Sequence, residues 1–468
     1  MFDDQTPERT DIPMRSYYKS MPVNGEISLY AGPIRLEWMV GTSGTKGVSE
    51  SEGTIKLNLQ GKPDIRFDVT IPQPFAFVEA EGDLQIGSSL SASSVPYLML
   101  KRTTSSSVGD TKVSGVISGE GIVIQELKAN GKAESVGRVQ FHLINFLKYR
   151  GDVLTEVEGQ NQHEWLGRII FSMGEWEITL DQFQDIESRL EQAKAVGGNV
   201  LTHIGLLKRK DAASKLSPLF DPKDAAKVFE ALYWFLSFMN GALCAFATPV
   251  GLRHLGRPLW QQWGLYSTTE VDTRQNWFSA GATQECFRAA DSFYTLWMMA
   301  EKREWLNLAI GLYLASNHNN GGIELPLANS QILLEMLTWV ALQEENTLMS
   351  NESFEKLPAS DKIRALLFWL GVPTSIPEAL KELIAAFPKA DYPRIDAPEA
   401  VVKIRNLVIH PTKTNRVRRS EISNNAIYDA WQLNLWYADL TIFKLIGYSG
   451  RYNNRTGNPK SGEWDITP

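Results

Sequence analysis

The sequence predicts an α+β multidomain protein in which a β-rich, sandwich-like N-terminal domain precedes an all-α helical bundle. Apolar residues alternate at every second position through the first part, as in Ile55, Leu57 and Leu59, which is the pattern of strands with one buried face. From about residue 283 they instead recur at steps of three and four, which is the pattern of amphipathic helices. The length of 468 residues also exceeds one ordinary domain.

Short strands are expected to make up most of the first two hundred residues. Many short strands separated by turn residues, with few helices, are typical of a β-sandwich or barrel. Two serine-rich stretches, at 88–94 and 105–107, are expected to form exposed loops between them. The strands are expected at residues 34–40, 55–59, 65–71, 122–124, 139–143, 176–180 and 200–206.

An uncharged window of 22 residues, 231–252, is long enough to span a membrane. Polar residues, glycines and a proline interrupt it, however. Asp221 is placed to cap a helix that has Pro222 in its first turn, and Gly241 is placed to end it. We therefore expect a buried helix up to about Met239, followed by a strand or loop, and no membrane-spanning segment.

The second part is expected to contain helix after helix. A long final helix, at 427–445, should end near Gly447, and Ser360 is the expected N-cap of an earlier one. The predicted helices lie at about 286–300, 305–316, 325–342, 361–370 and 427–445. The predicted domains are a β-rich sensing or regulatory domain at 1–210, a transition region with one buried helix and strands at 211–282, a helical domain at 283–448 and a flexible tail at 449–468.

Composition excludes several classes of protein. The net charge of −7, with a pI of about 5.6, excludes a uniformly basic nucleic-acid coat protein. Two cysteines, Cys244 and Cys286, cannot alone form a disulfide framework or a structural zinc site. The first fifteen residues lack the apolar core of a signal peptide. A cytoplasmic protein without metal or cofactor is the expectation.

Several motifs fail as catalytic signatures. The glycine-rich stretch 41–47 lacks the glycine that a phosphate-binding loop needs directly before Lys46, so it predicts a hairpin turn. No nucleophile elbow is present. Five histidines have no metal-ligand spacing and are expected to be structural or surface residues: His142, His163, His203, His254 and His318.

The sixth histidine lies in a distinctive segment. Asp396 and Glu399 form a capping-box pattern at the start of a short helix that carries Arg405, Asn406 and His410. Because Asn406 and His410 are four residues apart, Asn406 is placed to orient the imidazole.

Arg405 and His410 are five residues apart, which separates them by ~140° on a regular helix. Pro411 disfavours the helical conformation for the residue before it, so we expect the helix to end at His410 and free its side chain from the regular period.

A local basic run follows this helix. Residues 405–420 contain five positive charges and no acid, which makes a phosphate-attracting field in an otherwise acidic protein. An ordinary capped helix followed by a solvated basic loop is the alternative interpretation. The cations after the helix are Lys413, Arg416, Arg418 and Arg419.

The sequence Arg405-Asn406-x-x-x-His410 resembles the Arg-x(4–6)-His motif of HEPN ribonucleases, in which a polar residue usually follows the arginine. With the preceding β domain, the domain order is similar to that of ApeA-type anti-phage proteins, which join an ApeA-like N-terminal domain to an all-α HEPN helical bundle. The resemblance covers about 283–447 and, through domain order and strand content, the N-terminal part.

This resemblance implies a metal-independent endoribonuclease whose active site is shared by the two chains of a dimer. The ribose 2′-hydroxyl would attack the adjacent phosphate, with His410 as general base or acid and Arg405 as donor to the phosphorane oxygens. Asn406 would orient the imidazole or bind phosphate. The cations expected to guide the RNA backbone are Lys413, Arg416, Arg418 and Arg419.

The leading hypothesis is therefore an abortive-infection effector in anti-phage defence that cleaves RNA, with tRNA among the substrates that fit by analogy. It would be a homodimer or higher even oligomer, would respond to a phage-derived trigger and would use no cofactor. The alternative is a non-catalytic RNA- or protein-binding module whose helical bundle only dimerises. A sugar-binding β-sandwich ranks below both.

Overall fold

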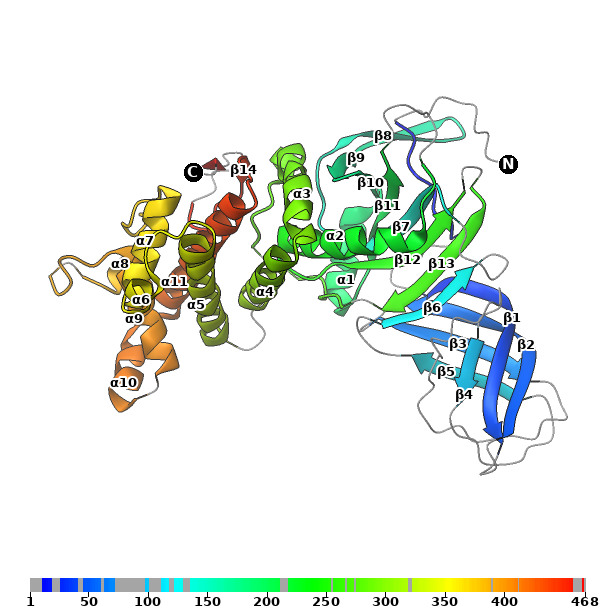
Figure 1. The fold of residues 1–468 in the computed structure, drawn as a ribbon, viewed down its shortest axis with the longest axis horizontal. Coiled ribbons are helices and arrows are strands. Elements are labelled where there is room, and N and C mark those ends of the chain that lie inside the picture. Colours follow the sequence, from blue (N-terminus) through cyan, green and yellow to red (C-terminus); the bar gives the residue numbers. More distant parts are fainter. Residues whose placement is uncertain are drawn as a thin grey trace. The chain divides into compact units, whose positions relative to one another are not determined.

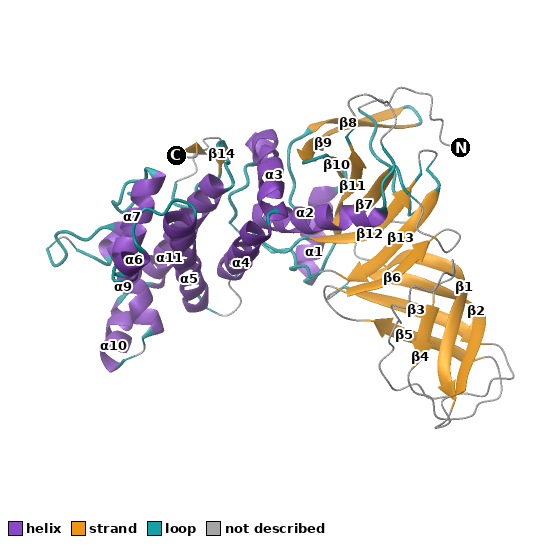
Figure 2. Ribbon diagram, in the orientation of Figure 1, coloured by secondary structure: helices purple, strands orange, loops and turns teal. Residues whose placement is uncertain are grey.

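The computed structural model describes most of the chain, and it divides into two compact units. The β-unit comprises Met1–Phe171, Glu175–Tyr233 and Cys244–Asp272, and the helical unit comprises Ser172–Gly174, Trp234–Leu243 and Thr273–Pro468. Strands dominate the first unit and helices the second (Figure 2), which confirms the predicted α+β class. The described residues are 11–18, 26–40, 45–59, 63–71, 97–100, 111–117, 122–128, 135–210, 218–253, 256–265, 267–272, 275–318, 322–388, 390–410, 412–457 and 465–466.

A five-stranded sheet, ordered β4-β1-β2-β3-β5, opens the β-unit (Figure 1). β1 and β2 pair antiparallel with Val40 opposite Thr45, as a hairpin requires, although the turn residues 41–44 lie outside the described residues. The serine-rich stretches 88–94 and 105–107 also lie outside them. The strands are β1 (Glu26–Val40), β2 (Thr45–Asn58), β3 (Asp64–Ile71), β4 (Tyr97–Leu100) and β5 (Thr111–Ile117).

The second sheet has eight strands in the order β6-β13-β12-β7-β11-β10-β9-β8. Its central strand β7 is buried along almost its whole length, including the polar side chains of Gln140 and His142. Helix α1 (Ile186–Val196) joins β10 to β11. The strands are β6 (Ile122–Lys128), β7 (Arg138–Ile144), β8 (Asp152–Glu158), β9 (Asn161–Met173), β10 (Trp176–Gln182), β11 (Leu201–Arg209), β12 (Ala245–Leu252) and β13 (Pro258–Leu265).

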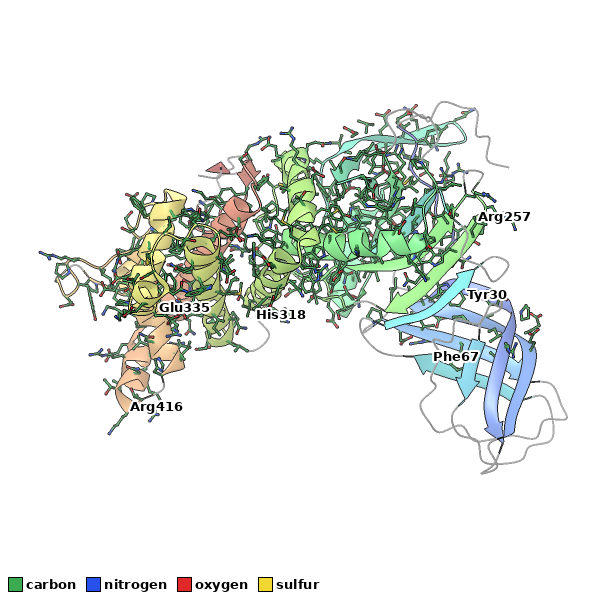
Figure 3. All side chains as sticks on the ribbon, viewed as in Figure 1. Tyr30, Phe67, Arg257, His318, Glu335 and Arg416 are labelled. Carbon is green, nitrogen blue, oxygen red and sulfur yellow. The ribbon has the colours of Figure 1, made fainter. Side chains whose placement is uncertain are left out.

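One cluster of buried side chains contains residues of both sheets. Ile27, Leu57 and Phe67 of the five-stranded sheet belong to the same cluster as Ala247 and Val250 of the eight-stranded sheet, and Phe67 is labelled in Figure 3. Burial of alternating residues from two sheets against each other is the principle of a β-sandwich. The sandwich-like arrangement expected from the period-two pattern is therefore present in this shared core.

Helix α2 (Ala225–Asn240) overlaps the first part of the uncharged window 231–252 and is largely buried. Its Phe229 ring packs edge-on against Phe141 and Phe246 of the eight-stranded sheet, with centroid separations of 5.2 Å in each case. The side chain of Asp221 caps the preceding 3₁₀ turn η3 (Pro222–Asp224). Gly241 then takes a φ of 67°, which a residue without a side chain adopts most easily. The buried helix was predicted correctly.

The helical unit is built around α11, which packs against α4, α5, α7, α8 and α9. The predicted helices are present, but Ser360 is not an N-cap, because α7 already begins after Pro358. The elements are η4 (Ala280–Ala282), α3 (Thr283–Met298), α4 (Ala300–Asn317), α5 (Glu324–Trp339), the π-helical turn η5 (Val340–Glu344), α6 (Asn351–Glu355), α7 (Ala359–Leu370), α8 (Lys381–Ala385), α9 (Ala397–Ile409), α10 (Lys413–Glu421), α11 (Asn424–Leu445), β14 (Arg451–Tyr452) and β15 (Asp465–Ile466).

One helical segment, Glu324–Glu344, has the length and apolar character of a membrane-spanning helix, with 21 residues and a mean hydropathy of 1.2. However, 61% of the tested window is buried inside the protein. Burial of this kind is typical of a core helix in a helical bundle.

Two of the predicted boundaries differ from the structure. The transition region 211–282 is not separate, because β12 and β13 pair into the eight-stranded sheet of the β-unit. The tail 449–468 was expected to be flexible, yet its first part packs onto the helical unit, where Tyr452 and Arg455 are buried. Residues 458–464 and 467–468 lie outside the described residues.

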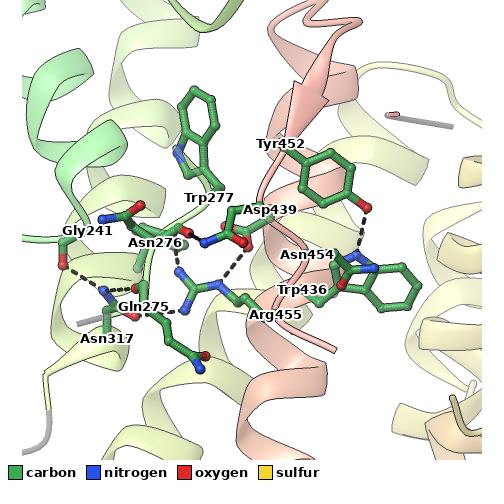
Figure 4. A network of polar contacts seen from close by, with 12 residues as sticks. Gly241, Gln275, Asn276, Trp277, Asn317, Trp436, Asp439, Tyr452, Asn454 and Arg455 are labelled. Carbon is green, nitrogen blue, oxygen red and sulfur yellow. Dashed lines mark hydrogen bonds and ion pairs between the residues drawn. The ribbon is translucent and has the colours of Figure 1, made fainter. Parts of the chain in front are cut away.

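A buried ion pair holds this C-terminal segment (Figure 4). Arg455 Nε donates to Asp439 Oδ2 of α11 at 2.7 Å, and their side chains are 1% and 0% exposed. Arg455 Nη1 also donates to Asn317 Oδ1 at 3.0 Å. The sequence did not reveal this arrangement, because a glycine- and asparagine-rich segment with two arginines carries no apolar pattern.

We predict that Arg455→Ala destabilises the protein by about 3–5 kcal/mol, because it leaves the Asp439 carboxylate buried without its counter-charge. Arg451→Ala is the matched control: Arg451 pairs with Glu285 at the surface and is 44% exposed, so its loss should cost much less than that of Arg455. Urea denaturation followed by circular dichroism measures both. Equal losses in the two variants would contradict the role given to Arg455.

A second prediction concerns pH. Burial lowers the pKa of His142 and of His203 to about 3, whereas histidine in an unfolded chain titrates near 6.5. The unfolded state therefore binds more protons between these values, so stability is full above about pH 6.5 and falls as the pH drops below it. His203→Phe, which keeps the stacking on Tyr149, should flatten the decline. Urea midpoints at pH 7.5 and 5 test this, and an unchanged slope in the variant would refute it.

Candidate functional site

The start of helix α9 is fixed by a side-chain cap. Asp396 Oδ1 accepts a hydrogen bond from Glu399 N at 3.0 Å, and Pro398 lies in the first turn. The Glu399 side chain does not return to the cap residue, as a full capping box would require. It instead forms ion pairs with Arg364 at 3.5 Å and Lys403 at 3.4 Å. The predicted helix start is confirmed.

The same cap residue connects α9 to α7. Arg364 donates from Nε and Nη2 to the two carboxylate oxygens of Asp396, at 2.6 and 2.8 Å. It also bonds Asp361. Hydrogen bonding to Asp396, with help from Asp361, raises the pKa of Arg364 above its ordinary value. This bidentate pairing fixes where the helix begins relative to its neighbour.

Packing of α9 leaves its arginine at the edge of the bundle. Val401 and Ile404 are buried, and the side chain of Arg405 emerges beside them, 22% exposed. Its Nη1 donates to Asn406 Oδ1 at 3.0 Å, while Nη2 lies 3.8 Å from Glu335 Oε1 on α5, labelled in Figure 3. The guanidinium therefore lies between an amide and a carboxylate.

Helix α9 ends at Ile409, as predicted. His410 has non-helical angles (φ −104°, ψ 82°), and its backbone N–H donates to Asn406 O at 3.1 Å. Pro411, on which that prediction depended, lies outside the described residues. The His410 side chain is exposed. Within the described part of the chain, Asn406 Oδ1 bonds Arg405 and no hydrogen bond joins the Asn406 side chain to the imidazole, so the expected orienting contact is not formed here.

A second cap joins α9 to α10. Thr412 Oγ1 accepts a hydrogen bond from Asn415 N at 3.2 Å, which starts α10. The Asn415 side-chain amide then donates to His410 O at 2.8 Å and to Asn406 O at 3.4 Å. Asn406 O also accepts the last helical hydrogen bond from His410 N, whereas the His410 carbonyl lies beyond the helix and has no helical donor. Asn415 therefore holds the backbone of His410 in place.

The basic run forms helix α10, and its cations do not share one face. At ~100° per residue, Lys413 and Arg416 lie ~60° apart around the helix, and Arg418 lies ~140° from Lys413. Arg416 is labelled in Figure 3. Arg419 faces the bundle: its Nη2 donates to Glu324 at 2.8 Å, a bond that lowers the pKa of Glu324. Of the four cations expected to guide RNA, Lys413 and Arg416 form an exposed pair, Arg418 lies on a separate face, and Arg419 is paired with Glu324. Their contact with RNA stays a prediction.

This arrangement provides a permanently charged planar donor and an accessible imidazole at one end of a helix. Arg405 and Asn406 are in contact, and His410 lies one turn further along the chain. A guanidinium suits phosphate oxygens, and an imidazole exchanges protons near neutral pH. Among the residues that the structure describes, no group of three His, Cys, Asp or Glu side chains is placed to hold a metal ion. A cavity of about 170 Å³ in the helical unit, lined by Glu285, Arg288, Ala289 and 447–449, includes no residue of the motif.

Comparison with known proteins gives matches to two domains of one kind of protein. Residues 131–274 match the family model of the YopA central domain, and residues 300–465 match that of the YopA C-terminal domain. The chain is similar to YopA-type proteins. Across 479 residues it is 25% identical to the SPbeta prophage-derived uncharacterized protein YopA of Bacillus subtilis (strain 168), and the match covers 98% of each chain. No solved structure matches the chain.

The two YopA matches follow the two parts of the fold. Strands β7 to β13 lie within the central-domain match, and α4 to α11 lie within the C-terminal match. The motif 405–410 and helix α10 therefore belong to the YopA C-terminal domain match.

Two residues next to the motif were not identified from the sequence. Asn415 had a usable signal, because a threonine three residues before it is a common start of a helix. Glu335 had none, since it lies 70 residues before Arg405 and only packing of α5 against α9 brings them together.

We predict that Asp396→Ala destabilises the helical unit by about 1–2 kcal/mol, because it removes the N-cap of α9 together with the partner of Arg364. Asp396→Asn is the matched control, since asparagine still caps a helix but carries no charge for Arg364. It should lose less stability than the alanine variant. Urea denaturation monitored at 222 nm measures both, and an equal loss would show that the cap itself contributes nothing.

Proposed function

We propose that this protein is a metal-independent endoribonuclease of the HEPN type that acts as an abortive-infection effector in anti-phage defence. The observation that carries the proposal is the sequence Arg405-Asn406-x-x-x-His410 at the end of a capped helix in a helical unit. The YopA relative is prophage-derived. A prophage shares its host with other infecting phages, so an anti-phage activity would serve it. The cytoplasm is the proposed location.

In the proposed reaction His410 takes or returns a proton at the ribose 2′-hydroxyl or the leaving 5′-oxygen. Arg405 donates to the non-bridging phosphate oxygens as negative charge builds on them. The products are a 2′,3′-cyclic phosphate and a 5′-hydroxyl. RNA is the proposed substrate, with tRNA included by family analogy. Lys413 and Arg416, which are exposed and adjacent on α10, contact its backbone.

Placement of the motif favours a site made by two chains. The Arg405 guanidinium bonds its own Asn406, and the His410 side chain faces solvent. The motif of a second chain, facing that of the first, would complete the active site. We therefore include a homodimer or higher even oligomer in the proposal. A phage-derived trigger would control when that site is used.

A non-catalytic RNA- or protein-binding module is the second candidate. The observation in its favour is that Arg405 and Arg419 each lie beside a carboxylate, Glu335 and Glu324 respectively. Acidic neighbours reduce the field that a phosphate meets. RNA binding without cleavage in a purified sample would support this alternative.

We predict that His410→Ala and Arg405→Ala each reduce RNA cleavage by a factor of about 10²–10⁴, the usual contribution of a general acid–base group or a charge-stabilising donor. Purified protein is incubated with total tRNA in EDTA, and new ends are tested for a 2′,3′-cyclic phosphate. His163→Ala, which alters an exposed histidine of β9, is the matched control and should cleave like wild type. Cleavage that persists in both motif variants, or that EDTA abolishes, would refute the proposed site.

A further inference from the structure

A short segment near the N-terminus crosses the eight-stranded sheet instead of joining it. Residues 11–18, which we call the strap, form no strand. Asp11 O accepts a hydrogen bond from Thr155 N of β8 at 2.6 Å, and Ile12 O accepts one from Arg168 Nη2 of β9 at 2.8 Å. Met14 N donates to Asp181 Oδ2 of β10 at 2.7 Å. Since β8, β9 and β10 are neighbours in the sheet, successive strap residues meet successive strands.

The next strap residues contact a strand further across the sheet. The side-chain amide of Gln140 on β7 donates from Nε2 to Arg15 O at 3.0 Å and accepts from Tyr17 N at 2.6 Å. Gln261 Nε2 on β13 then donates to Tyr17 Oη at 3.3 Å. One amide therefore bonds two backbone groups of the strap, which fixes both its direction and its position.

Chain length agrees with an extended strap. β7 stands four positions from β8 in the strand order, which is ~19 Å at ~4.8 Å per strand spacing. Residues 11 to 17 are six steps apart and span ~20 Å when extended. An extended peptide of this length therefore reaches from one strand to the other without slack.

The sheet binds the backbone of the strap and leaves three of its eight side chains exposed. Ile12 is 46% exposed and Tyr17 is 38% exposed, and Arg15 is exposed as well. Only Tyr18, at 6%, is buried, and its ring centroid lies 6.4 Å from that of His142. Recognition therefore depends mainly on backbone N–H and C=O groups and one aromatic anchor, with the Tyr17 hydroxyl as a further contact.

The groups that bind the strap are themselves buried. The side chains of Arg168 and Asp181 are 10% and 3% exposed and bond each other at 2.6 Å, and Gln140 is 7% exposed. Polar groups buried without a hydrogen-bond partner are strongly disfavoured. If the strap leaves, the Gln140 amide loses both of these bonds and Asp181 loses one. In this structure the backbone groups of an extended peptide satisfy them.

We propose that this face of the eight-stranded sheet is a peptide-binding groove, formed by Gln140, Arg168, Asp181 and Thr155 and occupied in cis by the strap. Its second ligand is an extended segment of a partner protein with an aromatic residue at the position of Tyr18. Because the groove residues form hydrogen bonds with backbone groups, the partner needs the aromatic residue but no other identity to the sequence of the strap. The groove residues lie within the YopA central-domain match, and the strap lies outside it. This inference does not rest on the proposed nuclease function.

Because the strap is covalently attached, it competes with any free peptide for the groove, and this competition determines how binding can be measured. A covalently attached strap competes at an effective concentration of order mM, so a free peptide binds the wild-type chain weakly. Weakening the strap without altering the groove should expose the site. Met14→Pro does this, because proline lacks the N–H that donates to Asp181, and Met14→Ala is the matched control that keeps it.

The experiment uses the full-length chain and a fluorescein-labelled peptide of residues 11–18, with binding followed by fluorescence anisotropy. We expect the Met14→Pro chain to bind the peptide at least tenfold more tightly than wild type or Met14→Ala. Adding Gln140→Ala to Met14→Pro should reverse that gain. A peptide carrying Tyr18→Ala should bind at least tenfold more weakly than the unmodified peptide.

A second variant guards against a folding defect in the first. Tyr17→Pro removes the N–H that donates to Gln140 and should produce the same gain, with circular dichroism confirming that each variant folds. The proposal is overturned if neither proline variant binds the peptide more tightly than Met14→Ala, or if the gain is indifferent to Gln140→Ala.

Discussion

Desolvation of charge is the constraint on which much of this structure depends. A buried charge is stable only when an opposite charge and enough hydrogen bonds compensate it. In this protein such buried ion pairs join segments that are far apart in sequence. Arg168 with Asp181 holds the strap on the sheet, and Arg455 with Asp439 holds the C-terminal segment on α11. In each segment a buried tyrosine, Tyr18 or Tyr452, adds hydrophobic packing to these ion pairs and hydrogen bonds.

The same constraint positions the candidate site, where the paired charges are less buried than those of Arg455 and Asp439. Arg364 and Asp396 set where α9 begins, and Asn415 holds the backbone where it ends. Between these points the register of the helix leaves no freedom, so Arg405 must emerge beside Asn406. The His410 side chain alone extends past the end of the helix. In the proposed reaction, a donor fixed by its helix would act with an exposed imidazole that lies beyond it.

The sequence predicted those features that short-range patterns encode. Alternating strands such as β3, the capped start of α9 and its end before Pro411 were all visible, because each depends on residues a few positions apart. Strand β8 was missed, since it is an edge strand with only Leu154 buried and so shows almost no alternation. The role of Arg419 was misjudged for a related reason: Glu324 lies 95 residues away in the chain, and only the folded bundle brings the two charges together.

The backbone-directed contacts of the strap have a consequence for how this protein can change over evolution. A segment held by its peptide groups is more free to vary at Ile12 and Arg15, whose side chains are exposed. Gln140, by contrast, satisfies two strap groups at once and has no close substitute. Related proteins are therefore expected to differ in the sequence of the strap while they keep the residues of the groove. A comparison of sequences by residue identity would then recognise the groove residues and miss the strap that occupies the groove.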